Sequence, residues 1–138
     1  MRTDPVSLLP PERTLDGTLG VEFVDATEEI AHARLPVTDR VRQPYGIVHG
    51  GAYAAIAESL CSMTTAMAVL NDGMIAVGQS NFTSFFRPVS EGTVHAEARR
   101  KHRGRTSWVW EVECTDDEGR LCALVRVTMA IRPGGRGA

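Results

Sequence analysis

One stretch, residues 50–70, is the only part of this 138-residue chain with the apolar period of a long helix. Its large side chains recur at steps of three and four, which places them on one stripe of a helix. They are Tyr53, Ile56, Leu60, Met63, Met67 and Leu70. Because the rest of the chain has the pattern of strands and turns, this stripe is predicted to lie on a sheet.

The opposite face of the predicted helix carries small residues and a single charge. Its members are Gly51, Ala54, Ala55, Glu58, Cys61, Ser62 and Thr65. Apart from the Tyr53 phenol and the Cys61 thiol, Glu58 is the only ionisable group between positions 50 and 70. A lone carboxylate among small side chains is typical of a pocket floor or a subunit contact. A glutamate that simply faces water is the alternative interpretation.

The start of the helix carries two glycines, Gly50 and Gly51. They leave backbone N–H groups bare at the positive end of the helix dipole, where a partial negative charge is favoured. The oxyanion formed from a thioester carbonyl would suit such a site. A pair of glycines that only permits a tight turn is the other interpretation.

Composition limits the classes of function. A chain of this length forms one domain, and its 15 basic against 17 acidic residues, a net charge of -2, argue against nucleic-acid binding. The chain has an odd number of cysteines, and their spacing is not that of metal ligands; they are Cys61, Cys114 and Cys122. We therefore expect reduced thiols in the core and no metal site, which fits a cytoplasmic protein. Residues 1–15 have no apolar run of signal-peptide length. The charge at Glu58 argues against a membrane-spanning helix.

Alternating residues and turn signals predict two strands before the helix and four after it. The predicted strands are 19–27, 29–37, 74–89, 92–103, 105–115 and 120–131. Two sets of side chains are each predicted to share one face of a strand. They are Trp108, Trp110, Val112 and Cys114 in one strand, and Leu121, Ala123, Val125, Val127, Met129 and Ile131 in the next. His32 is predicted to point outward from its strand. We therefore predict an α+β fold, with an arm at 1–18, one domain at 19–132 and a flexible tail at 133–138.

The helix carries a recognisable order of residues: His49-Gly50-Gly51, six further residues, Glu58, and Ser62 one turn later. This order resembles the active-site helix of the hotdog-fold acyl-CoA thioesterases. The resemblance is to the branch with the phenylacetate-type, 4-hydroxybenzoyl-CoA-type and enterobactin-proofreading enzymes. It runs from residue 19 to residue 131, with similar motifs at 86–89 and 104–105. It implies a single hotdog domain, in which an antiparallel sheet of six strands wraps around one long central helix.

The resemblance also implies roles for individual residues. Glu58 would activate water or attack the acyl carbon, and the sequence leaves both roles open. Gln43, His49 and Gly50 would hold the thioester carbonyl, and Ser62 would share a water molecule or a hydrogen bond with Glu58. Outside the family, Gln43 would be an ordinary loop residue and His49 a structural one.

A basic cluster surrounds the predicted turn at Gly104. Arg103 and Arg105 are interpreted as contacts to the phosphates of coenzyme A, because guanidinium groups match phosphate oxygens. A solvated hairpin end is the alternative. No cofactor is expected, since coenzyme A would be part of the substrate.

The predicted function is hydrolysis of an acyl-CoA or acyl carrier protein thioester with an aromatic or short- to medium-chain acyl group. A non-catalytic acyl-CoA binding protein and a hotdog-fold dehydratase are the alternatives. Gly50 and Glu58 lie eight residues apart, about 12 Å along one helix. That span is too long for one reacting carbon, so we expect a homodimer with shared active sites. We also expect a homotetramer built as a dimer of dimers.

Overall fold

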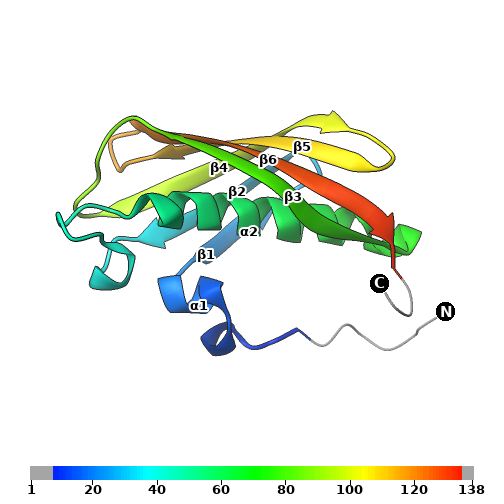
Figure 1. Ribbon diagram of the computed structural model, residues 1–138, viewed down its shortest axis with the longest axis horizontal. Coiled ribbons are helices and arrows are strands. Elements are labelled where there is room, and N and C mark those ends of the chain that lie inside the picture. Colours follow the sequence, from blue (N-terminus) through cyan, green and yellow to red (C-terminus); the bar gives the residue numbers. More distant parts are fainter. Residues whose placement is uncertain (1–7, 135–138) are drawn as a thin grey trace.

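The structure is a computed structural model that describes residues 8–134, and Figure 1 shows one long helix and six strands. The long helix α2 spans Gly50–Val69. The strands are β1 (Glu22–Ala26), β2 (Ile30–Pro36), β3 (Met74–Phe85), β4 (Thr93–Arg103), β5 (Ser107–Thr115) and β6 (Leu121–Pro133). The short helical segments are η1 (Pro11–Arg13), α1 (Leu15–Leu19), η2 (Asp39–Val41) and η3 (Leu70–Asp72).

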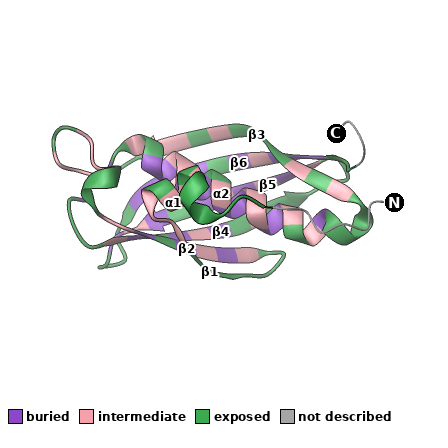
Figure 2. Cartoon of the chain, turned by 90° about the horizontal axis from the view of Figure 1, so that it is seen from below, coloured by how far each residue is buried: buried purple, intermediate pink, exposed green. Residues whose placement is uncertain are grey.

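The six strands form one antiparallel sheet in the order β1-β2-β4-β5-β6-β3. The sheet curves around α2, and Figure 2 shows β1 and β3 at its two edges with the helix between them. This arrangement confirms the predicted fold. Among residues 8–134, no strand pairs with the outer side of the twelve-residue strand β3.

The buried face of α2 is wider than one stripe. Its buried residues are Ala52, Tyr53, Ile56, Ala57, Leu60, Cys61, Thr64, Thr65 and Val69. Up to Thr65 the buried residues come in adjacent pairs every four residues. Because one turn of the helix takes 3.6 residues, each pair is rotated about the helix axis by about 40° from the pair before it. The face thus follows the curved sheet, and Thr65 meets Trp110 Nε1, which donates a hydrogen bond of 2.9 Å to its hydroxyl.

Four positions on α2 and η3 therefore differ from the straight stripe that the sequence predicts. Met67 and Leu70, expected against the sheet, are 63% and 58% exposed. Cys61 and Thr65, expected on the opposite face, are completely buried. The sequence period identifies the helix, whereas the twist of the sheet decides which side chains it covers.

The inward faces of the strands form the remainder of the core. Trp108, Trp110, Val112 and Cys114, which are predicted to share one face, are all buried. The residues of the second predicted face are also buried from Ala123 to Ile131. Leu121 is the exception at 39% exposed, because it starts β6 beside an irregularity in its pairing with β5. The three cysteines are buried and unpaired, which agrees with the predicted core thiols. Burial raises the pKa of the Cys114 thiol to about 12.

The segment before the sheet differs from the predicted strand 19–27. Leu19 ends α1, and β1 begins only at Glu22. Thr14 caps α1 by accepting a hydrogen bond from the Gly17 N–H, and Gly20 ends it with a left-handed φ of 87°. Parts of the predicted arm and tail, residues 1–7 and 135–138, lie outside the described residues.

His32 points outward from β2, as predicted, and links three strands. Its Nδ1 lies 2.6 Å from Asp25 Oδ1 on β1, and its Nε2 lies 3.0 Å from Glu97 Oε2 on β4. The hydrogen bond to Asp25, followed by the one to Glu97, raises the pKa of His32. The protonated ring therefore ties the edge strand β1 to the sheet.

We predict that this cluster makes stability depend on pH. Because the pKa of His32 is raised in the folded state, its contribution is complete below the unfolded-state value of about 6.5 and is lost as pH rises through the folded-state pKa. The free energy of unfolding, measured with urea, should fall over this range in the wild type and stay flatter in His32→Gln. Arg34→Gln removes a neighbouring 2.7 Å ion pair to Glu22 and should leave the shape of the pH profile unchanged. Identical profiles for His32→Gln and the wild type would contradict the prediction.

Candidate active site

The N-terminus of α2 is capped by His49. The ring Nδ1 of His49 accepts a hydrogen bond of 2.8 Å from the Gly51 N–H. A neutral ring that accepts at Nδ1 carries its proton on Nε2, so this second nitrogen is a donor on an exposed side chain. Among residues 8–134 no group accepts a hydrogen bond from the Gly50 N–H. Two donors, the His49 Nε2–H and the Gly50 N–H, therefore stand at the positive end of the helix dipole.

The loop before α2 holds Gln43 in a fixed turn. The Gln43 N–H donates to the Ile47 carbonyl at 2.8 Å, and the Gly46 N–H donates to the Gln43 carbonyl at 2.9 Å. The side-chain oxygen of Gln43 accepts from the Tyr45 N–H. Its oxygen is thus engaged within the loop, and its amide NH₂ group is oriented as a donor.

A cavity of about 500 Å³ lies beside these groups. Its lining consists of Gln43, Ile47, Val48, Gly50, Tyr53, Phe85, Phe86, Arg87, Pro88 and Cys122. The Phe85 ring lies so close to the helix start that a Cβ at Gly50 would be 2.7 Å from it. The rings of Phe85 and Tyr53 lie 6.1 Å apart at 56° and form an aromatic wall. The cavity is therefore mostly apolar, with the Gly50 backbone and the Gln43 side chain among its few polar groups.

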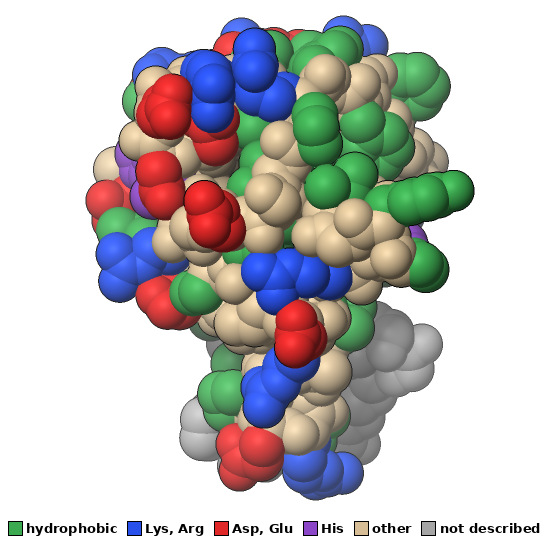
Figure 3. All heavy atoms as spheres, turned by 90° about the vertical axis from the view of Figure 1, so that its left-hand side faces the viewer, with side chains coloured by type: hydrophobic (Ala, Val, Ile, Leu, Met, Phe, Trp, Pro, Cys, Tyr) green, Lys and Arg blue, Asp and Glu red, His purple; other side chains and the backbone are tan. Residues whose placement is uncertain are grey.

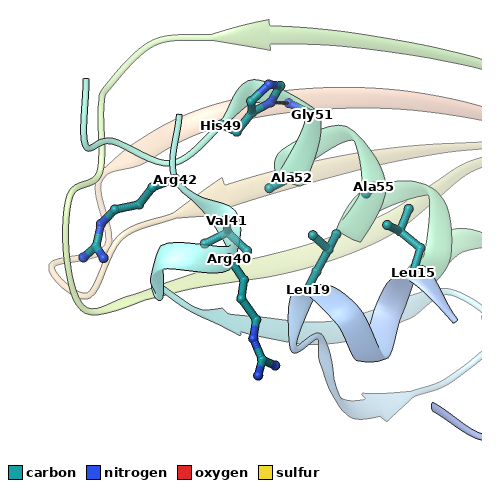
Figure 4. A pocket seen from close by; sticks show the side chains of 9 residues that line it. All are labelled: Leu15, Leu19, Arg40, Val41, Arg42, His49, Gly51, Ala52 and Ala55. Carbon is teal, nitrogen blue, oxygen red and sulfur yellow. Dashed lines mark hydrogen bonds between the residues drawn. The ribbon is translucent and has the colours of Figure 1, made fainter. Parts of the chain in front are cut away.

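A smaller cavity, of about 220 Å³, lies between α1, η2 and the start of α2. Figure 4 shows its lining: Leu15, Leu19, Arg40, Val41, Arg42, His49, Gly51, Ala52 and Ala55. The leucines of α1 reach toward α2 in this view, whereas both arginines extend away from it. The turn His49-Gly50-Gly51 contributes to both cavities, because Gly50 lines the larger one and its two neighbours line the smaller one.

The face of the molecule where α2 begins is rich in hydrophobic side chains. Figure 3 views this face and shows them gathered over one part of it. Tyr45, Phe85 and Phe86 are 91%, 57% and 57% exposed in the single chain. Exposed aromatic residues beside a cavity are typical of a surface that binds a ligand or a partner subunit.

Glu58 is exposed on α2 and lies over the edge strand β3. A Cβ at Gly78 would be 3.3 Å from the Glu58 carboxyl carbon, so the glycine makes room for this side chain. The pairing of β3 with β6 is irregular between Gly78 and Ser80. Close by, Asn81 Nδ2 donates a hydrogen bond of 3.0 Å to the Ala54 carbonyl and fastens β3 to the helix. The carboxylate is thus held at the unpaired edge of the sheet.

Ser62 lies one turn after Glu58 and contacts a different group. Its hydroxyl donates to Met129 Sδ at 3.7 Å. Gln43, His49 and Gly50 gather at the start of α2, while Glu58 lies about 12 Å further along the helix axis. One chain therefore brings together the residues predicted to hold the thioester carbonyl but keeps the predicted carboxylate apart from them.

The basic turn lies at the other end of the helix (Figure 1). The Thr106 carbonyl, next to this turn, accepts a hydrogen bond from the Ile131 N–H. Ile131 pairs with Ala76, which follows shortly after the end of α2 and η3, so the turn lies near that end of the helix. The Arg103 guanidinium lies 5.1 Å from the Trp108 ring centroid and 3.2 Å from Glu28, whereas Arg105 is exposed. Within one chain the two predicted phosphate contacts are thus far from His49.

Sequence reasoning missed Gly78, Asn81 and Phe85. A glycine inside a strand pattern is the one signal that was present, because it marks a bulge or a close approach. The contacts of Asn81 and Phe85 depend on how β3 aligns with α2, and no local pattern encodes that alignment. Among residues 8–134 no cluster of His, Cys, Asp and Glu side chains could hold a metal ion.

Comparisons of the sequence with known proteins identify a family and several relatives. The profile of the Thioesterase superfamily matches residues 45–123. The proofreading thioesterase EntH of Cronobacter turicensis is 38% identical over 118 residues, which cover 86% of this chain and 85% of that protein. The similarity therefore spans the sheet, the helix and the cavity-lining loop.

Solved structures share the fold as well as the sequence. A variant of thioesterase PA1618 from Pseudomonas aeruginosa superposes with a TM-score of 0.84 at 34% identity, covering 88% of each chain. A variant of thioesterase SAV0944 from Staphylococcus aureus gives 0.82 at 30% identity, covering 86% of this chain and 98% of that one. The glutamine and the glutamate replaced by alanine in SAV0944 structures lie fifteen positions apart, the same separation as Gln43 and Glu58.

We predict that the cap formed by His49 stabilises the start of α2. His49→Ala removes the helix cap and should lower the free energy of unfolding by about 1 kcal/mol. His49→Asn keeps a side-chain oxygen that accepts from the first turn and should recover most of this loss. Urea unfolding of the three proteins measures the effect. Equal stability of His49→Ala and the wild type would show that the bond to the Gly51 N–H does not stabilise the helix.

Proposed function

The chain belongs to the Thioesterase superfamily, and on this premise we propose that it hydrolyses the thioester of an acyl-CoA or an acyl carrier protein. The products are a free acid and a thiol. The size of the larger cavity and its Phe85 and Tyr53 wall support an aromatic or a short- to medium-chain acyl group. Coenzyme A enters only as part of the substrate.

The observation that carries the proposal combines two features of α2. The Gly50 N–H lies beside an apolar cavity and has no acceptor among residues 8–134, and Glu58 is the only carboxylate of the helix. The acyl group occupies the cavity, and its carbonyl oxygen accepts hydrogen bonds from the Gly50 N–H and the Gln43 amide. His49 Nε2–H donates to the same carbonyl. These donors stabilise the negative charge that develops on the oxygen in the transition state.

Glu58 supplies the second half of the chemistry. As a general base it removes a proton from water, the hydroxide oxygen bonds to the acyl carbon, and the carbon–sulfur bond then breaks. The thiolate that leaves takes up the proton from Glu58. As a nucleophile, the Glu58 carboxylate would bond to the acyl carbon while the carbon–sulfur bond breaks, which gives an anhydride and a thiolate. Water then cleaves the anhydride to the free acid and the Glu58 carboxylate, and the proton released goes to the thiolate. Ser62 orients the carboxylate or the water in either route.

The two halves meet if β3 pairs with its own copy. In the described part of the chain, residues 8–134, the outer edge of β3 has no partner strand. This edge is long, and Val77 and Phe82 on β3 are 52% and 72% exposed, features that favour pairing with another strand. The first half of β3 lies against Glu58, and its second half lies against the start of α2. Antiparallel pairing about the middle of β3 places the first half of one strand beside the second half of the partner's strand. Glu58 of one subunit then lies near the start of the partner's helix. We assign Gln43, His49 and Gly50 to one subunit and Glu58 and Ser62 to the other.

The same pairing supports the remaining proposals. In the dimer, the basic turn at Gly104, which lies near the end of α2, is close to the start of the partner's helix. There Arg103 and Arg105 contact the phosphates of coenzyme A. Ile75, Val77 and Phe82 lie on the face of β3 that points away from the helix and are exposed. Two dimers that pack through this face would form the homotetramer.

We predict that Glu58→Gln lowers kcat at least about a hundredfold, the scale expected when a positioned base is lost. Ser62→Ala should lower it about tenfold, because it only orients the carboxylate or the water. Release of free thiol from a panel of aromatic, short-chain and long-chain acyl-CoAs measures both. Glu91→Gln, a change of the same kind in an exposed loop, is the matched control and should leave kcat unchanged. Near-normal turnover by a folded Glu58→Gln protein would remove this carboxylate from the mechanism.

A second prediction tests whether the site is shared between subunits. Inactive Glu58→Ala and inactive His49→Ala chains are mixed under conditions that exchange subunits. Random pairing makes half of the dimers mixed, each with one intact site of two, so activity should return to about a quarter of the wild-type value. Mass spectrometry confirms the exchange. No recovery after confirmed exchange would place His49 and Glu58 in the same site from the same chain.

A further inference from the structure

The Glu58 carboxylate has no polar partner that would hold it in place within the chain. Among residues 8–134, the side-chain hydrogen bonds of α2 involve other positions, which are Ser59, Ser62, Thr64 and Thr65. An exposed glutamate without a partner has several rotamers open to it. The position of this carboxylate therefore depends on the helix backbone and on the strand next to it, β3.

That strand contains one extra residue. The register of β3 with β6 shifts between Gly78 and Ser80, so Gln79 has no partner residue on β6. An extra residue in one strand of an antiparallel pair is a β-bulge, a feature that is frequent beside active sites and re-aims side chains there. Because side chains alternate between the two faces of a strand, the bulge moves the residues after it to the opposite face.

The bulge turns Asn81 toward α2. Gly78, before the bulge, faces the helix, since a Cβ there would lie 3.3 Å from the Glu58 carboxyl carbon. In a regular strand Ser80 would be the next residue to face the helix, and Asn81 would point away from it. In the structure Ser80 is exposed, and Asn81 Nδ2 donates a hydrogen bond of 3.0 Å to the Ala54 carbonyl. The strand thus places an amide against the helical turn that precedes Glu58.

Both ends of the Asn81 amide are engaged. Its Oδ1 accepts a hydrogen bond of 2.8 Å from the Thr83 hydroxyl, which leaves the NH₂ group as the end directed at Ala54. In an α-helix the Ala54 carbonyl also accepts the N–H of the residue four positions later, which is Glu58. Asn81 and the backbone of Glu58 therefore bind the same oxygen atom.

We propose that Asn81 is a positioning residue for Glu58 and that the bulge at Gln79 directs it to this task. The inference rests on the proposed thioester hydrolysis with Glu58 as base or nucleophile. The amide holds this turn of α2 at a fixed distance from β3, and Gly78 leaves the space into which the carboxylate extends. Because β3 is also the strand that pairs with its copy in the proposed dimer, the same link places Glu58 relative to the partner's site.

The first test is kinetic. Asn81→Ala should lower kcat at least about tenfold, because a displaced carboxylate is seldom in line with the acyl carbon, and should leave KM nearly unchanged. In the Glu58→Gln protein the same change should cause no further loss, since both substitutions act on one group. An unchanged kcat in Asn81→Ala, or a full additional loss in the double variant, would overturn the proposal.

Ser59→Ala is the matched control. It removes the hydrogen bond of 2.5 Å that the residue next to Glu58 donates to Asp16 Oδ1 on α1, so it loosens the same part of α2 on another side. This variant should keep the wild-type kcat. A loss in Ser59→Ala equal to that in Asn81→Ala would show that any weakened contact of the helix has the same effect, and the specific role of Asn81 would be wrong.

A measurement without turnover separates this inference from the proposed function. NMR couplings across the Cα–Cβ bond of Glu58 report its χ1 rotamers. We expect one dominant rotamer in the wild type and in Ser59→Ala, and averaged couplings in Asn81→Ala. If no thioester is hydrolysed but the couplings change in this way, the proposed function fails and the role of Asn81 stands. If the thioesters are hydrolysed and neither kcat nor the couplings respond to Asn81→Ala, the role of Asn81 fails alone.

Discussion

Burial of α2 by the curved sheet determines which of its side chains are left for chemistry. Ile56, Leu60 and Thr65 are completely buried, and Trp110 donates a hydrogen bond to the Thr65 hydroxyl within the core. With the buried face fixed in this way, the helix cannot turn about its axis without moving a buried group into solvent. Glu58 is then held over β3, where Gly78 leaves space for it and Asn81 fastens the strand to the helix.

The same burial leaves the start of α2 open to a ligand. His49 caps the helix through Nδ1, and the Gly50 N–H has no acceptor among residues 8–134. Phe85 lies against Gly50 and forms the cavity wall with Tyr53, so the glycine serves the packing of that ring as well as the exposure of its own N–H. The Gly50 N–H therefore lies both at the positive end of the helix dipole and at the wall of the apolar cavity.

Much of the fold could be predicted from the sequence because strand and helix periods are local properties. The long helix, the six strands and the buried face of β5 follow from spacing and turn residues alone. The exposure of Met67 and the burial of Cys61 could not be predicted, because they depend on how the sheet twists around the helix. The start of β1 was also missed, because a threonine cap and Gly20 make a short helix of residues 15–19.

The site shows the same division. The residue order from His49 to Ser62 indicates which side chains carry the chemistry, and the similarity to known thioesterases supports that interpretation. The sequence does not reveal the neighbours of these side chains. Ser62 donates to Met129 and Glu58 lies over Gly78, both through contacts between different elements of the fold. Arg103 packs on Trp108 across a hairpin turn.

The central claim is that one thioester site combines the start of α2 from one subunit with Glu58 from another. A crystal structure with a non-hydrolysable acyl-CoA analogue tests it most directly. We expect the two β3 strands to pair antiparallel, with the ligand carbonyl oxygen at the Gly50 N–H of one subunit. The carbonyl carbon should lie beside the partner's Glu58. A complex in which the carbonyl lies beside the Gly50 and Glu58 of a single chain, or in which β3 remains unpaired, would contradict this arrangement.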